Sequence, residues 1–151
     1  MSENIIVNER GAFGGSVQGY DRKEITVVAD EAIAVGTVVE ILSTNYNTTT
    51  KEYQVTAAAT DGLNHAILGV ALEAATAEGD RIRVLQRGIG TVLCSANVAT
   101  DKQLAVMTTA GRVDDANNVS GNAGTLVKVI GQSLSANASG DGGTVTAYIN
   151  C

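Results

Sequence analysis

Residues 67–74 read Ile-Leu-Gly-Val-Ala-Leu-Glu-Ala, and residues 129–136 read Val-Ile-Gly-Gln-Ser-Leu-Ser-Ala. Aligning the two stretches places one glycine over another and one leucine over another, namely Gly69 over Gly131 and Leu72 over Leu134. Each stretch combines β-branched or apolar residues with a central glycine, a texture typical of strands rather than helices. The pair therefore predicts one β-motif used twice, with a chance match among small residues as the alternative.

The match extends to both sides of these stretches. Upstream, residues 32–39 (Ala-Ile-Ala-Val-Gly-Thr-Val-Val) resemble residues 97–106. Downstream, Gly-Asp turns at residues 79–80 and 140–141 each lead into a segment of alternating apolar residues, which is the period of a half-buried strand. We expect pseudo-repeats at about 24–87 and 88–149 within a single β-domain covering residues 23–151.

The rest of the chain has the same strand-rich texture. Short runs of Val, Ile and Thr alternate with clusters of Gly, Asn and Asp, which predicts an all-β fold, a small compact barrel or sandwich of about ten short strands. Residues 73–78 could form one turn of helix before Gly79. The expected strands are 24–28, 37–42, 52–58, 66–74, 79–86, 88–94, 103–107, 111–114, 125–135 and 143–149.

The first 22 residues differ from the remainder. Four glycines between positions 11 and 19 interrupt the apolar residues, a spacing that suits neither helix nor strand interiors. We interpret residues 1–22 as an N-terminal arm that docks either on a partner chain or on its own domain. The candidate contact residues are Ile5, Ile6, Val7, Phe13 and Tyr20.

Composition disfavours several classes of partner. The chain has 16 acidic and 10 basic residues and a net charge of −6, so it should repel a phosphate backbone, and we expect no nucleic-acid partner. One Phe, four Tyr and no Trp offer little material for an aromatic-lined pocket. No stretch approaches the length of a membrane span and no signal peptide is recognisable, so we expect a soluble protein made in the cytoplasm with Cys94 and Cys151 reduced.

Catalytic patterns are weak throughout. His65 is the only histidine, and it follows Gly-Leu-Asn in a turn-like context that favours a solvated loop residue. Asp114 and Asp115 either alternate sides on a strand or share a loop, where such carboxylates are usually solvated, and nothing further supports a calcium site there. Gly88 and Gly90 lack the third glycine of a dinucleotide-binding loop and are better read as strand-start or bulge glycines. We expect no enzyme activity, no metal and no cofactor.

One basic stripe stands out on this acidic chain. Arg81, Arg83 and Arg87 fall on one face by the period-2 rule, while Ile82 and Val84 fall on the other. The arginines are candidate contacts to acidic groups of a neighbouring subunit, with an ordinary solvated sheet face as the alternative. Glu73 could pair with them.

Several of these segments together resemble a known family. They are Ala-Ile-x-x-Gly-x-Val-Val at 32–39, the run at 67–75, Glu-Gly-Asp-x-Ile-x-Val at 78–84, and the following Gly-Ile at 88–89. The combination resembles the capsid cement, or head decoration, proteins of tailed bacteriophages, formerly catalogued as a domain of unknown function. The resemblance covers about residues 24–149, and the chain departs from the pattern in longer loops at 45–51 and 114–124.

This resemblance implies a structural role. Proteins of this kind are compact β-domains, commonly homotrimers, that bind the major capsid protein on the outer face of an assembled head. We therefore expect a virion protein that stabilises the capsid by bridging its subunits. The alternative is a carbohydrate- or receptor-binding β-module of a head fibre or surface appendage, because β-sandwiches readily carry such sites.

Overall fold

The structure, a computed structural model, describes residues 22–47, 52–60, 66–117 and 128–151. These ranges contain strands and connecting turns and no helix, which confirms the predicted all-β class. The strands are β2 (Lys23–Ala29), β3 (Val38–Asn47), β4 (Glu52–Ala57), β5 (Ala66–Ala71), β6 (Arg81–Leu93), β7 (Gln103–Val106), β8 (Val113–Asp115), β9 (Val129–Ser133) and β10 (Thr144–Asn150).

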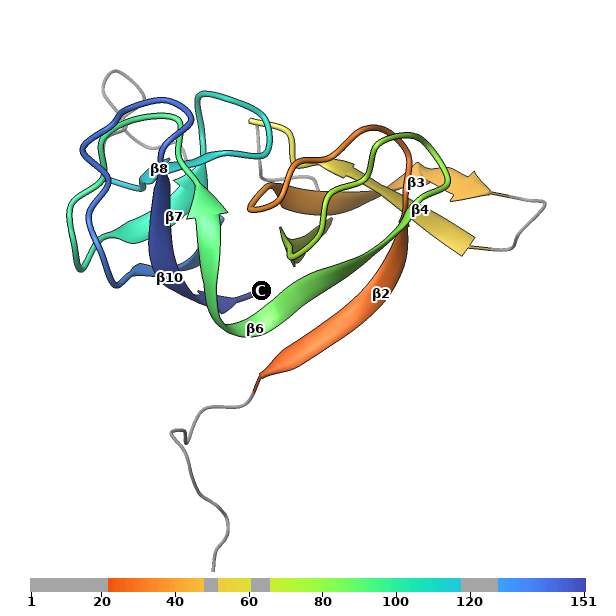
Figure 1. The fold of residues 1–151 in the computed structure, drawn as a ribbon, viewed down its shortest axis with the longest axis horizontal. Helices are drawn as coiled ribbons and strands as arrows, with labels where there is room; N and C mark the ends of the chain where they lie inside the picture. Colours follow the sequence, from red (N-terminus) through yellow and green to blue (C-terminus); the bar gives the residue numbers. More distant parts are fainter. Residues whose placement is uncertain (1–21, 48–51, 61–65, 118–127) are drawn as a thin grey trace, which may run out of the picture.

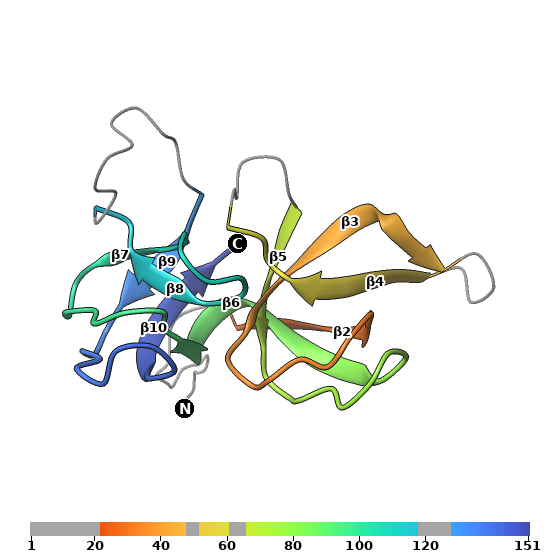
Figure 2. The same ribbon diagram turned by 90° about the horizontal axis from the view of Figure 1, so that it is seen from above.

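The strands form two barrels that share β6. The strand order is β2-β4-β3-β5-β6-β10-β9-β7-β8, and β2 also pairs with β6, so the first five strands close on themselves. In the second half, Cys94 directly after β6 forms a parallel bridge to Val113 of β8, at the opposite end of the strand order. Figures 1 and 2 show the resulting two lobes, with the long β6 passing from one to the other.

The two barrels repeat the same register. Val39 of β3 lies opposite Gly69 of β5, and the pairing then shifts by a bulge; Leu104 of β7 lies opposite Gly131 of β9, and the same shift follows. The first half of the fold thus corresponds to the second strand by strand, with β2 matching the C-terminal half of β6. The internal duplication predicted from sequence is present in the backbone.

Hydrogen bonds between backbone groups show the same correspondence. In both halves, matching donors and acceptors join the end of the first strand of the barrel and the loop after it to the end of the fourth strand and the loop that follows it. The matched bonds are Ile33 N to Ala75 O with Val98 N to Asn137 O, Gly36 N to Ala71 O with Asp101 N to Ser133 O, Ala71 N to Thr37 O with Ser133 N to Lys102 O, and Gly79 N to Ala29 O with Gly142 N to Cys94 O.

The aligned glycines serve one purpose. A Cβ on Gly69 would lie 2.2 Å from the carbonyl oxygen of Leu85, and a Cβ on Gly131 would lie 2.1 Å from that of Tyr148. Neither carbonyl can withdraw without breaking the strand pairing at that point. The two stretches that reveal the duplication in the sequence are therefore the places where two backbones approach too closely for any side chain.

Three expectations about the strands were wrong. Residues 79–86 and 88–94 form one strand, β6, because Gly88 at φ +123° makes a bend that leaves the pairing with β10 uninterrupted. Residues 73–78, for which the sequence gives only poor helix evidence, form no helical turn, and Ala75 forms a bridge to Ile33. The strand expected at 66–74 ends at Ala71 for the same reason, and that expected at 125–135 spans Val129–Ser133 within the described residues.

The apolar side chains form two clusters. The first barrel encloses one of them, which includes Ile82, Val84 and Val55. The other fills the second barrel and extends across the junction, where it takes in residues on the outer face of the first barrel: Val38, Ala58, Ile67, Val70 and Leu85. We call these five residues the covered face, because the second barrel buries them.

Backbone hydrogen bonds fasten the junction. Gly111, in the turn between β7 and β8, accepts from Val38 N and donates to Ala58 O, both at 2.8 Å. A Cβ on Gly111 would lie 2.5 Å from Cγ2 of Thr37, so glycine allows the turn to approach this closely. Leu93 N also donates to Gly36 O at 2.9 Å. Apolar packing and directional bonds together fix the orientation of the two barrels.

Candidate interaction surface

The outward face of β6 carries two of the three predicted arginines in one row. Arg81 and Arg83 are exposed, whereas Ile82 and Val84 between and after them are buried in the first barrel. This alternation confirms the period-2 prediction for residues 81–84. The next residue on the arginine side, Leu85, is buried because the second barrel covers that part of the first.

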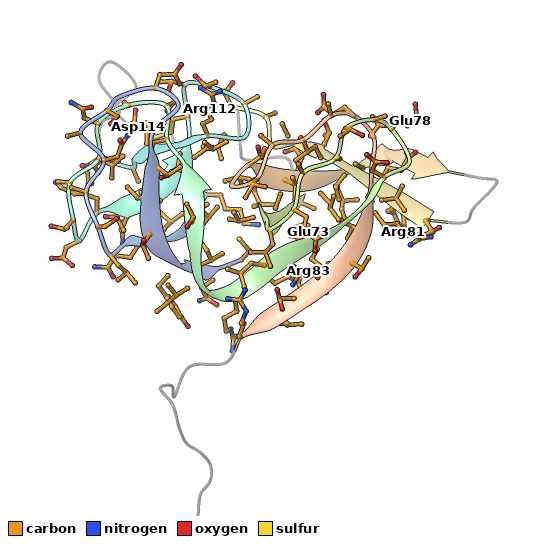
Figure 3. The ribbon with its side chains drawn as sticks, in the orientation of Figure 1. Glu73, Glu78, Arg81, Arg83, Arg112 and Asp114 are labelled. Atoms are coloured by element: carbon orange, nitrogen blue, oxygen red, sulfur yellow. The ribbon has the colours of Figure 1, made fainter. Side chains whose placement is uncertain are left out.

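Arg83 lies between two carboxylates from different elements. Its Nε donates to Glu73, in the loop after β5, and its Nη1 lies 3.3 Å from Glu24 Oε2 on β2. Figure 3 shows Arg83 and Glu73 side by side on the outer face. The hydrogen bond that Glu73 accepts and the negative charge of its carboxylate raise the pKa of the Arg83 guanidinium. The predicted pairing of Glu73 with the arginines is confirmed at this residue.

The row continues on both sides. Arg81 Nη2 lies 2.8 Å from Glu52 Oε2 at the start of β4. Arg22 Nη2 lies 3.3 Å from Glu24 Oε2, and its Nη1 donates to the carbonyl oxygen of Ile89 at 3.0 Å. We call Arg22, Glu24, Glu52, Glu73, Arg81 and Arg83 the charged ladder. Each of its three arginines lies close to at least one of its glutamates, so much of the basic character of the stripe is neutralised within the chain.

Arg87 sits apart from this ladder. It is exposed, but it lies beyond a bulge where the pairing of β2 with β6 shifts between Lys23 and Glu24. The bulge breaks the simple period that placed Arg87 on the face of Arg81 and Arg83. The role of the three arginines in contacting a neighbour stays a prediction.

The remaining predicted contact residues, Ile5, Ile6, Val7, Phe13 and Tyr20, lie outside the described residues, as does His65. One prediction about the acidic residues was wrong. Asp114 is buried, with Oδ1 accepting from Asp115 N at 2.7 Å, because β8 closes the second barrel beside Cys94. Asp115 faces outward and lies 3.2 Å from Lys102 Nζ.

The reactive side chains of the described ranges are scattered. No three His, Cys, Asp or Glu residues there are grouped so as to hold a metal ion. Burial raises the pKa of the Cys94 thiol to about 11, so Cys94 is protonated at neutral pH. Among the described segments, no helix is long and apolar enough to cross a membrane.

Sequence reasoning missed an apolar surface. Four large apolar side chains are exposed in the described part of the chain: Val35, Tyr53, Val129 and Leu134. Two of them lie in or beside β9, where Val129 occupies the position that buried Ile67 has in the first barrel. The alignment of the two stretches carries one signal of this surface, because it places apolar Val129 opposite apolar Ile67. An apolar residue at the same place in both repeats suggests that both places are contact sites.

Comparison with known proteins adds a structural neighbour. No family model and no curated protein matches the sequence. The fold is similar to the crystal structure of the N base of the head fibre gp8.5 of bacteriophage phi29, with a TM-score of 0.57 and 13% identity over 86% of this chain and 95% of that one. This chain therefore shares its β-fold with that head fibre base.

Proposed function

We propose that this chain is a structural protein of the surface of a phage head. The observation that carries the proposal is the likeness of nearly the whole fold to the N base of a phage head fibre, which spans both barrels. The resemblance of residues 67–84 to cement proteins of tailed phages supports the same location, and it rests on the sequence alone.

Within this class, we propose a cement protein that binds the major capsid protein from outside and bridges its subunits. Such a protein performs no chemistry. It binds the assembled head and not the free subunits, so it stabilises assembly by mass action, with about 2.7 kcal/mol per site when its concentration is a hundred times its Kd. Self-association as a homotrimer would place equivalent contacts around a three-fold position.

The N-terminal arm supplies a candidate for attachment. It precedes β2, which begins at Lys23, and carries five apolar contact candidates within a glycine-rich stretch. Ordering each arm residue costs about 1–2 kcal/mol, so its apolar anchors must recover that on binding. Arg81, Arg83 and Arg87 are the candidate polar contacts, and the ladder glutamates would compete with the capsid for Arg81 and Arg83.

The structural neighbour favours a second candidate, the base of a head fibre. A base anchors an appendage and need not strengthen the shell. The two candidates therefore differ in one measurable property, the resistance of the head to disruption when the protein is bound.

The test is co-sedimentation with capsids of the phage whose head the protein is proposed to belong to. The purified chain should co-sediment with expanded heads but not with unexpanded proheads or isolated capsid subunits, and saturated heads should withstand higher temperature. Binding without any gain in head stability would select the fibre-base candidate. No binding to either kind of head would overturn both.

Two variants accompany this assay. A chain that begins at Asp21 should melt like the full chain and lose head binding; equal binding would exclude the arm from attachment. The His65→Ala variant should bind and protect heads as the parent does, and a folded variant that had lost function would revive a catalytic role for the only histidine.

A further inference from the structure

Because the two barrels share one strand register, each residue of the covered face on the first barrel has a counterpart on the second barrel. The five residues of the covered face correspond, through the strand registers, to Gln103, Ala116, Val129, Gln132 and Tyr148 on the second barrel. Leu72, which packs against the junction cluster, corresponds to Leu134. We call these six second-barrel residues the terminal face. They occupy the position where a third barrel would sit if the array continued.

The terminal face has the framework of a junction without the cover. Ala116 N donates to Gln103 O at 2.8 Å, as Ala58 N donates to Val38 O at 2.9 Å in the covered face. Two of its apolar members are exposed, Val129 at 39% against 7% for Ile67, and Leu134 at 47%. Ala116 and Tyr148 are half-buried. A single small domain would gain solubility from polar residues at the positions of Val129 and Leu134.

The first barrel carries the complementary feature. In the junction, the residue that reaches across is Gly111, two positions before Val113 of β8. Val55 corresponds to Val113 because the two make equivalent parallel pairs. Val55 pairs with Ala29 at the end of β2, and Val113 pairs with Cys94 directly after β6. The counterpart of Gly111 is therefore Tyr53, which is 53% exposed on β4. Strands β3 and β4 extend away from the second barrel (Figure 2).

We propose that Tyr53 and the β4 strand around it dock on the terminal face of a second copy of this chain. The choice of a second copy follows from the surfaces themselves. Three of the four exposed large apolar side chains in the described part of the chain lie either on the terminal face or at Tyr53. The surfaces equivalent to these two, the covered face and the turn at Gly111, already meet within each chain. Tyrosine is enriched at protein interfaces and among their hot spots, and an exposed apolar patch is typical of an interaction site.

This contact is heterologous, because different surfaces of the two copies meet. Such contacts either close into a ring or continue into a filament. A ring of three would be the homotrimer proposed above, so the inference rests on the proposed self-association and names its interface. It does not depend on capsid binding.

The experiment compares three single variants by native mass spectrometry and light scattering of the free protein. Tyr53→Asp removes the docking side chain, Leu134→Asp disrupts the terminal face, and Val35→Asp is the control, since Val35 is 51% exposed and lies on neither surface. All three positions are exposed, so each variant should melt within a few degrees of the parent. We expect the parent and Val35→Asp to form the same oligomer, and the other two to dissociate at about tenfold higher concentration or more.

Mixing the two defective variants is the decisive step. A heterologous contact leaves one intact pair of surfaces between Tyr53→Asp and Leu134→Asp, so the mixture should form a heterodimer although each variant alone is monomeric. An interface built from one self-complementary patch would give no such rescue, and that result would overturn the inference. So would a parent that is monomeric at every concentration, or an oligomer that neither variant weakens.

The outcome is separable from the proposed function. A monomeric parent that still co-sediments with expanded heads would overturn the interface and leave the head-surface role standing. An oligomer that requires Tyr53 and Leu134 but does not bind heads would support the interface and overturn the head-surface role. Loss of head binding in Leu134→Asp while the oligomer persists would assign the terminal face to the capsid and overturn the inference.

Discussion

The two barrels have the same backbone and different outer surfaces. On the first barrel, Arg83 is held by Glu73; at the corresponding place on the second, Thr146 N donates to Ser135 Oγ at 2.9 Å. Register and bulges are nevertheless shared. Since the second barrel folds the same way with neutral groups at this place, the fold does not require an ion pair there, and Arg83 and Glu73 can serve a surface role.

The loops that close the barrels show a second difference. In the first, Asp80 Oδ2 accepts from Thr76 N at 2.7 Å, Thr76 Oγ1 at 2.9 Å and Ala77 N at 3.1 Å. In the second, the amide of Asn137 donates to Ala96 O and Gly140 O, both at 2.9 Å. One loop depends on a carboxylate and the other on a group that does not titrate.

The largest loss of stability is expected for a substitution in the covered face, and it tests whether that face is packed as a core. Leu85→Ala should lower the free energy of unfolding by about 3 kcal/mol, because it opens a cavity between the barrels. Tyr148→Ala, at the corresponding position of the terminal face, should lower it by about 1 kcal/mol or less under conditions where the chain is monomeric. Urea unfolding measures both. Equal losses would mean that the two faces are not differently covered.

The next effect concerns the aligned glycines. Gly69→Ala and Gly131→Ala should each destabilise the fold by about 2 kcal/mol, because the new methyl group meets a backbone carbonyl in each barrel. Gly79→Ala is the control, since nothing lies within 4 Å of its Cβ and only its φ of +94° opposes the substitution, at about 1 kcal/mol. If either aligned glycine tolerates alanine better than Gly79 does, the close approach is not a shared constraint.

A smaller effect separates the two loops by pH. Hydrogen bonds from Thr76 and Ala77 lower the pKa of Asp80 below its ordinary value of 3.8. A lowered folded-state pKa gives stabilisation that is complete above the ordinary value and is lost as the pH falls through the folded one. Amide exchange at Thr76 and Ala77 should therefore accelerate in acid beyond its intrinsic rate, while Ser139 beside Asn137 should not. In Asp80→Asn, this acid-specific acceleration should disappear.

The smallest effect concerns the ladder. A double-mutant cycle of Arg83→Gln and Glu73→Gln should give a coupling below about 1 kcal/mol that shrinks further in 1 M salt, because both side chains are largely exposed. The change in the free energy of unfolding caused by Ser135→Ala, at the neutral counterpart of Glu73, should not depend on salt. A strong coupling that persists in high salt would instead make the ladder a structural element of the first barrel.

The candidate site was only partly predictable. Alternation placed Arg81 and Arg83 on the outer face, and proximity in the motif suggested Glu73 as a partner. Glu24 and Glu52 could not be assigned, since they come from β2 and β4, and only closure of the barrel brings them to β6. The exposed apolar residues of the terminal face carry no local pattern of their own.

The sequence by itself determined the strand texture, the duplication and the inward or outward direction of side chains along β6, because these depend on residue type and a period of two. Only the tertiary structure decided which faces are covered. Leu85 and Tyr148 occupy equivalent places in their barrels, yet Leu85 is fully buried and Tyr148 is only half-buried. Likewise, Glu40 is buried with Oε2 accepting from Ala59 N at 3.1 Å, although nothing in its strand predicts it. Burial of an outer face depends on a barrel that folds from residues far along the chain, and no local period records that contact.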